Sequence, residues 1–212
     1  DLLAQDPNST LVGYMGVTAL PNVVDSLLAG AMNPDTPAAM VERGTTARQR
    51  SVVSTLAELP AAVEREGIEP PALFVVGPTV RHADKLDWFS RLPLAGERLL
   101  APETATALVR GLEDAGAEVI AAPCPTTTAS RIVVGSAPLT GCIVRNRAEV
   151  EWLDDEREGP GWEAHPVTWC LSSDAADRAR ELGWQRIQQT DVGKDDTAAV
   201  VEWIRRVRRR AA

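Results

Sequence analysis

Apolar positions in the first ninety residues alternate between short runs and helical spacing. The short runs predict four strands, with the sequences TLVGYMGV (10–17), AAMVERG (38–44), RQRSVVSTL (48–56) and PPALFVVG (70–77). Helical spacing, with a proline or glycine near an end, predicts three helices at 20–31, 56–67 and 81–92. The run at 70–77 has few polar atoms, so we expect a strand buried on both faces.

A break in this pattern follows, because proline and glycine flank a new apolar strand in RLPLAGERLL (91–100). We therefore place a boundary near Pro93. Beyond it, strands are predicted at 97–102, 117–123, 141–146, 165–173 and 186–191, and helices at 103–116, 147–157, 174–184 and 194–210. Regular alternation of strands and helices is typical of an α/β fold with a parallel sheet covered on both faces. We expect two compact units, each with its own sheet.

Composition narrows the function classes. The chain has 212 residues and a formal charge of −8, which argues against a nucleic-acid binder in spite of the basic end RRVRRR. No apolar run approaches the length of a membrane span. Cys124, Cys142 and Cys170 form no CxxC pair, which indicates reduced thiols and a cytoplasmic location. With only His82 and His165 available, a histidine metal site or catalytic triad is poorly supported.

Two short stretches could carry chemistry. Tyr14 and Met15 end the first predicted strand, and strand ends of α/β sheets commonly bind ligands, although both side chains could equally fill the core. Gly44 and Thr45 lie between two predicted strands, where a glycine permits positive φ or lets a ligand approach bare backbone. An ordinary turn is the alternative at this second stretch.

Several other residues are given structural roles. The five tryptophans of the second half fall on predicted apolar faces and are expected to pack in the core, namely Trp152, Trp162, Trp169, Trp184 and Trp203. The arginines near the end of the last helix complement the negative end of its dipole. The run Asp154-Asp155-Glu156 is expected to be a solvated helix face without a further role.

Taken together, the stretches TLVGYMGV, LPNVVDSLL, PDTPAAMVERGTTARQRSVVSTLAEL and PPALFVVGPTVRHADKLDWF resemble the C-terminal domain of uroporphyrinogen-III C-methyltransferases, from about Thr10 to Phe89. The resemblance implies methylation of uroporphyrinogen III by S-adenosyl-L-methionine to give precorrin-2, which leads to sirohaem and cobalamin. It implies that Met15 and Gly44 contact the cofactor, with Tyr14 and Thr45 beside them. It also implies a homodimer without nucleic-acid or membrane partners.

Departures from this family bear on activity. Its N-terminal domain, which carries the glycine-rich cofactor loops and the expected catalytic base, has no counterpart here, so residues 1–92 correspond to the C-terminal domain and no catalytic residue is assigned. Gly13 stands where the family often has an aromatic residue, and Ser54 where it often has glycine.

Residues 93–212 resemble uroporphyrinogen-III synthase, in LPLAGERLLAPETATALVRGLEDAGAEVIAAP, CIVRNRAEVEWL and VTWCLSSDAADRARELGW. The resemblance implies a single flavodoxin-like parallel-sheet lobe, whereas that family has two lobes around its substrate. Ala101-Pro102-Glu103-Thr104 also replaces the usual Thr-Arg. Three alternatives remain: a bifunctional methyltransferase and synthase, a methyltransferase with a non-catalytic assembly module, or a methyltransferase of a later precorrin.

Overall fold

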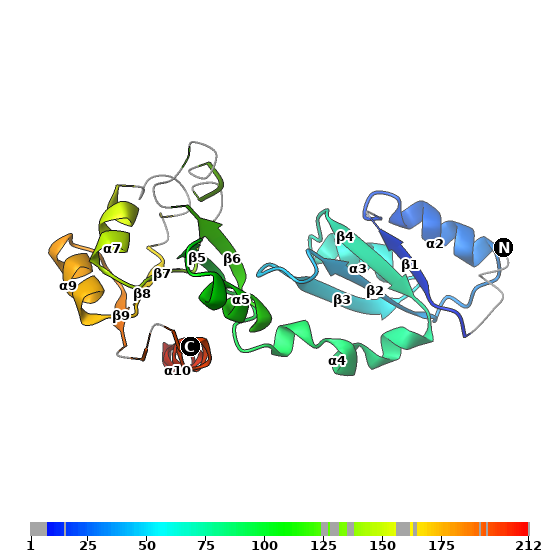
Figure 1. Cartoon of the computed structure of the whole chain (residues 1–212). Coiled ribbons are helices and arrows are strands. Elements are labelled where there is room, and N and C mark those ends of the chain that lie inside the picture. Colours follow the sequence, from blue (N-terminus) through cyan, green and yellow to red (C-terminus); the bar gives the residue numbers. More distant parts are fainter. Residues whose placement is uncertain are drawn as a thin grey trace. The chain divides into compact units, whose positions relative to one another are not determined.

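The computed structural model describes residues 8–14, 16–123, 127, 132–134, 138–155, 162, 165–190, 192–193 and 195–211 (Figure 1). The chain divides into two compact units, Asp1–Ser90 and Arg91–Ala212. Each unit has a sheet of its own, with four strands in the first and five in the second. The division falls close to Pro93.

The first unit has the predicted order of strands and helices. Its elements are β1 (Leu11–Tyr14), α2 (Leu20–Ala29), β2 (Pro37–Glu42), β3 (Arg50–Thr55), α3 (Leu59–Arg65) and β4 (Ala72–Val76). The strands lie in the order β1-β4-β2-β3, and every neighbouring pair is antiparallel. The expectation of a parallel sheet is therefore wrong for this unit. A short loop joins β2 to β3, and only a long crossover could have made them parallel.

One face of this sheet is covered by α2 and α3. Alternate residues of the strands point to that side, including Ala38, Met40, Phe74 and Val76, and pack with the apolar faces of the two helices. The other residues of β4, Leu73 and Val75, are only half-buried, so this strand is not enclosed on both faces as expected.

The third predicted helix of this unit is broken into short turns. The segment contains η1 (Pro78–His82), α4 (Ala83–Leu86) and η2 (Phe89–Arg91) in place of one helix over 81–92. Pro78 fixes the first turn, and the α-helical geometry ends at Asp87, whose ψ of 74° is incompatible with continuing the helix. The periodic pattern predicted a single helix here and was wrong.

The second unit is the predicted α/β lobe. Its elements are β5 (Arg98–Pro102), α5 (Thr106–Asp114), β6 (Glu118–Ala122), β7 (Gly141–Val144), α7 (Arg147–Asp154), β8 (Val167–Cys170), α9 (Ser173–Glu181), β9 (Ile187–Gln189) and α10 (Thr197–Ala211). All strand pairs are parallel, in the order β6-β5-β7-β8-β9. In sequence order this is 2-1-3-4-5, the flavodoxin-like arrangement, so the predicted fold class is confirmed.

Helices cover both faces of this parallel sheet. On one face α7 and α9 pack against β7 and β8, and on the other α5 and α10 enclose a core with Trp169 at its centre. All five tryptophans of this half are less than a tenth exposed, which confirms their structural role. At Gly111 on α5, an added Cβ would lie 2.1 Å from Cγ2 of Thr197, so glycine permits the close contact between α5 and α10.

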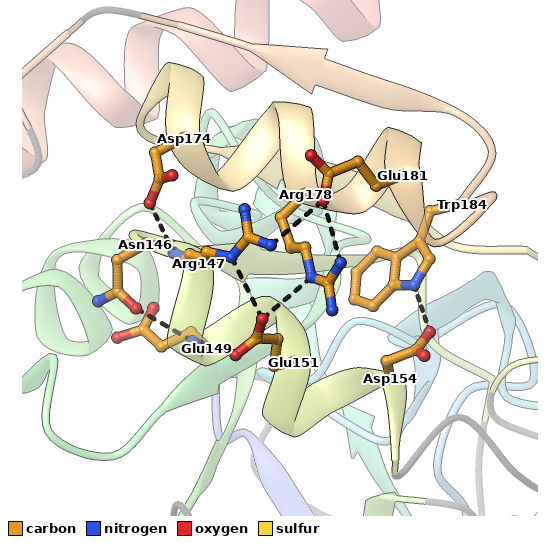
Figure 2. Close-up of polar contacts among 9 residues, drawn as sticks. All are labelled: Asn146, Arg147, Glu149, Glu151, Asp154, Asp174, Arg178, Glu181 and Trp184. Carbon is orange, nitrogen blue, oxygen red and sulfur yellow. Dashed lines mark hydrogen bonds and ion pairs between the residues drawn. The ribbon is translucent and has the colours of Figure 1, made fainter.

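A network of ion pairs fastens α7 to α9 (Figure 2). An oxygen of the Glu151 carboxylate on α7 lies 3.2 Å from a guanidinium nitrogen of Arg147 and 3.1 Å from one of Arg178. An oxygen of the Glu181 carboxylate on α9 forms ion pairs with the same two arginines at 3.3 and 3.0 Å. The hydrogen bond from Arg178 lowers the pKa of Glu181 and raises the pKa of Arg178 itself. Each carboxylate is shared between two cations, so the network fixes how the two helices lie against each other.

Asp154 has a structural role that the sequence analysis did not predict. We assigned no role to the acidic run at the end of α7, yet Oδ1 of Asp154 accepts a hydrogen bond from the indole Nε1 of Trp184 at 2.6 Å (Figure 2). A buried tryptophan usually needs a partner for its N–H, and this carboxylate supplies one. Glu156, the last residue of the run, lies outside the described residues.

The two described cysteines are buried, so we expect their thiols to react poorly with alkylating reagents in the folded chain. Cys142 and Cys170 are reduced thiols in the core of the second unit, and burial, with a smaller effect of Cys142, raises the pKa of Cys170 from 9.0 to about 12. Since the thiolate is the reactive form, Cys170 should resist iodoacetamide at pH 8 in the folded chain and react after unfolding in urea. Peptide mass spectrometry would measure this; equal labelling in both states would contradict it.

Candidate functional site

Residues 43–49 form the loop between β2 and β3, which we call the rim loop. It is fastened by its own hydrogen bonds: the Thr45 N–H donates to Oε1 of Gln49 at 2.7 Å, the Thr46 hydroxyl donates to the Arg43 carbonyl at 2.8 Å, and the Gln49 N–H donates to the Thr46 carbonyl at 3.1 Å. The Arg43 N–H donates to the Pro71 carbonyl at 2.9 Å, which ties the loop to the chain just before β4. The rim loop is thus a fixed structure with a defined shape.

Strain in this loop falls on the residues beside Gly44. Arg43 has φ of 47° and Thr45 has φ of 63°, a region that residues with a side chain seldom adopt. Such strain persists only where the surrounding structure enforces it, and it gathers at functional sites. The hydrogen bonds above supply that enforcement.

The fold does not require a glycine at position 44. Its φ lies outside the left-handed region, and a Cβ added there would lie 3.6 Å from Cγ1 of Val41, which is ordinary contact. Gly44 is exposed, and its N–H has no hydrogen-bond partner among the described residues. Neither backbone geometry nor packing among the described residues therefore requires glycine at position 44.

Tyr14 lies at the same edge of the sheet as the rim loop. Tyr14 on β1 pairs with Leu73 on β4, and Leu73 pairs with Val41 on β2, so the three form one row across the sheet. Two strand spacings separate Tyr14 from Val41, a distance on the order of 10 Å. Both β1 and β2 end at this edge, and the Tyr14 side chain is 79% exposed. The structure thus places Tyr14, Gly44 and Thr45 at one edge of the sheet; Met15 lies outside the described residues.

A groove opens beside the rim loop, on the sheet face opposite α2 and α3. It has a volume of about 510 Å³ and runs between strand residues such as Val41 and Val53 and the segment that contains Trp88. Thr45 and Gln49 of the rim loop also line it. Its size falls within the range of small-molecule sites, and its lining is largely apolar with a few polar groups.

Sequence reasoning missed the residues that hold the rim loop in place. Glu42 is buried, and its carboxylate accepts a hydrogen bond from Nε of Arg50 at 2.9 Å and lies 3.4 Å from Nε of Arg43. Arg50 also donates to the carbonyls of Glu66 and Gly67 at the end of α3. A buried carboxylate is costly unless paired, so Glu42 and Arg50 act as one anchor. The alternation of the strand, which places Glu42 on the same face as Met40, is the signal that could have revealed it.

Among the described residues, no group of three or more His, Cys, Asp and Glu side chains could hold a metal ion. No helix in the described part of the chain is both long and apolar enough to cross a membrane.

The comparisons with known proteins point to one family of enzymes. The chain is 51% identical over 89 residues to a siroheme synthase from Azotobacter vinelandii, and 46% identical over 87 residues to a siroheme synthase from Methylobacillus flagellatus. These matches cover 42% and 41% of this chain and 19% of each relative, so the chain spans about a fifth of the length of the relatives that it matches. These matches support a tetrapyrrole methylase domain in the chain.

Solved structures give a related result. Uroporphyrin-III C-methyl transferase from Thermus thermophilus, in a crystal structure with S-adenyl homocysteine, is 35% identical over 37% of this chain and 34% of that one, with a TM-score of 0.32. Its native form is 36% identical over the same shares, with a TM-score of 0.31. Overall similarity this low carries no argument about the fold. None of the protein-family models matches the chain.

Proposed function

We propose that this chain is part of an S-adenosyl-L-methionine-dependent methyltransferase that converts uroporphyrinogen III to precorrin-2, on the route to sirohaem and cobalamin. The observation that carries the proposal is Gly44, an exposed glycine that the fold does not require and whose N–H has no hydrogen-bond partner among the described residues. It lies on a hydrogen-bonded loop at the same sheet edge as Tyr14. The identity with siroheme synthases over 89 residues supports it, since that length matches the first unit.

The residues at this edge suit the cofactor. The Gly44 N–H is available to an acceptor atom, and bare backbone there allows close approach. The Thr45 hydroxyl donates to the Gly44 carbonyl at 2.7 Å, so its lone pairs remain free to accept. Tyr14 offers an exposed ring, and Met15 is assigned a packing contact with the adenosyl group. When bound, S-adenosyl-L-methionine supplies a methyl group on its sulfonium, and these residues orient it.

The remaining parts of the active site are assigned outside this chain. We assign the glycine-rich cofactor loops and the catalytic base to an N-terminal domain, as the resemblance to uroporphyrinogen-III methyltransferases implies. The relatives are about five times longer than the matched segment. We propose a homodimer formed through the methyltransferase part. The reduced thiols of Cys142 and Cys170 suit a cytoplasmic enzyme.

The second unit has two candidate roles, uroporphyrinogen-III synthase activity or non-catalytic assembly. Its flavodoxin-like order suits a lobe of such a synthase. One observation favours the non-catalytic role. Arg145, directly after β7, donates to Glu149 at 2.8 Å and to the Thr104 hydroxyl at 2.8 Å, so its guanidinium is engaged within the chain. An assay for conversion of the linear tetrapyrrole to uroporphyrinogen III distinguishes the two roles.

The proposed methyltransferase is tested with the full-length protein. Incubation with S-adenosyl-L-methionine and uroporphyrinogen III should give a product with two added methyl groups, detected by mass spectrometry. Methylation of a later precorrin without methylation of uroporphyrinogen III would assign the enzyme to another step. No methyl transfer to either, together with no binding of S-adenosylhomocysteine, would reject the proposal.

Replacement of Met15 by alanine tests its assigned contact. We expect S-adenosylhomocysteine to bind more weakly by roughly 1–2 kcal/mol, because mainly apolar packing is lost. Isothermal titration calorimetry measures the change. An unchanged dissociation constant would show that Met15 does not contact the cofactor.

A further inference from the structure

A second hollow lies beside the rim loop, and its lining is mostly charged. It has a volume of about 450 Å³, and its lining includes Arg43, Arg48, Arg50, Glu42 and Glu69. The lining therefore contributes three guanidinium groups and two carboxylates. A hollow with this balance attracts anions more strongly than cations.

The arginines of this hollow are not equivalent. Arg50 is engaged by Glu42 and by the carbonyls of Glu66 and Gly67, and Arg43 lies against the same Glu42 carboxylate. These two cations are used to neutralise a buried acid and to hold the end of α3. They therefore contribute positive charge to the hollow but have limited freedom to bind a ligand.

Arg48 differs from both. It is exposed, and among the described residues its guanidinium has no hydrogen bond or ion pair. Its backbone is nevertheless fixed, because the Arg48 N–H donates to the Thr46 hydroxyl at 3.2 Å and the following Gln49 N–H donates to the Thr46 carbonyl at 3.1 Å. A rigid loop thus presents an unengaged guanidinium four residues after Gly44.

This arrangement suits one chemical group. A guanidinium binds a carboxylate through two parallel hydrogen bonds, and a partner-free arginine on a fixed backbone loses little main-chain freedom when it does so. Uroporphyrinogen III carries carboxylate side chains around its ring. Resting on the proposed function, we propose that Arg48 is a specificity-determining residue that binds a carboxylate side chain of the tetrapyrrole substrate.

The position of Arg48 gives this contact a purpose. Gly44 and Arg48 belong to the same hydrogen-bonded loop, so an anchored carboxylate would hold the substrate in a fixed relation to the cofactor loop. Methyl transfer depends on such alignment, because a positioned pair of reactants avoids much of the entropic cost of meeting. A substrate without the carboxylate would lose this anchor.

The test is a titration of the full-length protein with uroporphyrin III, the stable oxidised relative of uroporphyrinogen III, followed by fluorescence. We expect Arg48→Ala to raise the dissociation constant about tenfold, in line with loss of one charge-assisted pair. Arg48→Lys should give a smaller increase, since it keeps the charge and loses the fork. The matched control is Arg65→Ala, which removes an exposed arginine of α3 and should leave the dissociation constant unchanged.

A parallel titration with S-adenosylhomocysteine separates the two proposals. Equal affinity of Arg48→Ala and Arg65→Ala for uroporphyrin III would overturn the role of Arg48, and unchanged cofactor binding would then leave the proposed function standing. A lower melting temperature of Arg48→Ala, with weaker binding of both ligands, would show a structural role and also overturn the assignment. If the unaltered protein binds uroporphyrin III but not the cofactor, the methyltransferase proposal fails while Arg48 is still tested.

Discussion

Replacement of Gly44 by valine is expected to weaken binding of S-adenosylhomocysteine to the full-length protein by at least about tenfold, or roughly 1.4 kcal/mol. The reason is steric: the valine side chain would occupy the space that we assign to the cofactor against bare backbone. The fold should tolerate the change, because a Cβ at Gly44 meets only ordinary contacts from Val41 and Gln49 and φ is not left-handed. Calorimetric titration measures the affinity, and a melting curve verifies the fold.

Two variants make this result interpretable. Gly44→Ala adds one carbon and should weaken binding less than valine does. Gly193→Val makes the same substitution at an open glycine of the second unit, where a Cβ meets nothing within 4 Å, and should leave affinity unchanged. Wild-type affinity in Gly44→Val, with an unchanged melting temperature, would show that the rim loop is only a turn.

Much of the second unit could be predicted because one signal governs it. Buried parallel strands such as Gly141–Val144 are apolar runs and helices such as Arg147–Asp154 have an apolar face, so their alternation indicates the α/β class. The N-terminal caps of α7 and α9 also depend only on nearby residues. The Asn146 side chain accepts a hydrogen bond from the Glu149 N–H, and the Ser172 hydroxyl accepts one from the Ala175 N–H. The strand order, in contrast, depends on packing between elements distant in sequence.

The first unit shows where the pattern is insufficient. The run at 70–77 has the same apolar character as a parallel strand, but it pairs antiparallel with β1 and β2, because strand direction depends on how the loops connect and not on hydrophobicity. The site was only partly predictable for a similar reason. Gly44 was found from its motif, whereas the positive φ of Arg43 and Thr45, normally a property of glycine, leaves no trace in residue type.

Gly13 offers a second strong test, now of stability. Gly13 pairs with Phe74 across β1 and β4, and a Cβ at Gly13 would lie 2.2 Å from Cζ of Phe74. The phenylalanine ring therefore fills the place of the missing side chain, which gives a physical reason for glycine at this position. The same ring lies over Gly16, where a Cβ would be 2.6 Å from Cδ1 of Phe74.

Gly13→Val is therefore expected to destabilise the first unit by about 3 kcal/mol, because Phe74 must leave its buried position. Phe74→Ala should cost a similar amount, about 3–5 kcal/mol, through the cavity that it creates. The double variant should be more stable than the sum of the single effects by at least about 1 kcal/mol, since valine then partly fills that cavity. Urea denaturation of all four proteins measures the cycle. Strictly additive losses would mean that Phe74 does not occupy the space over Gly13.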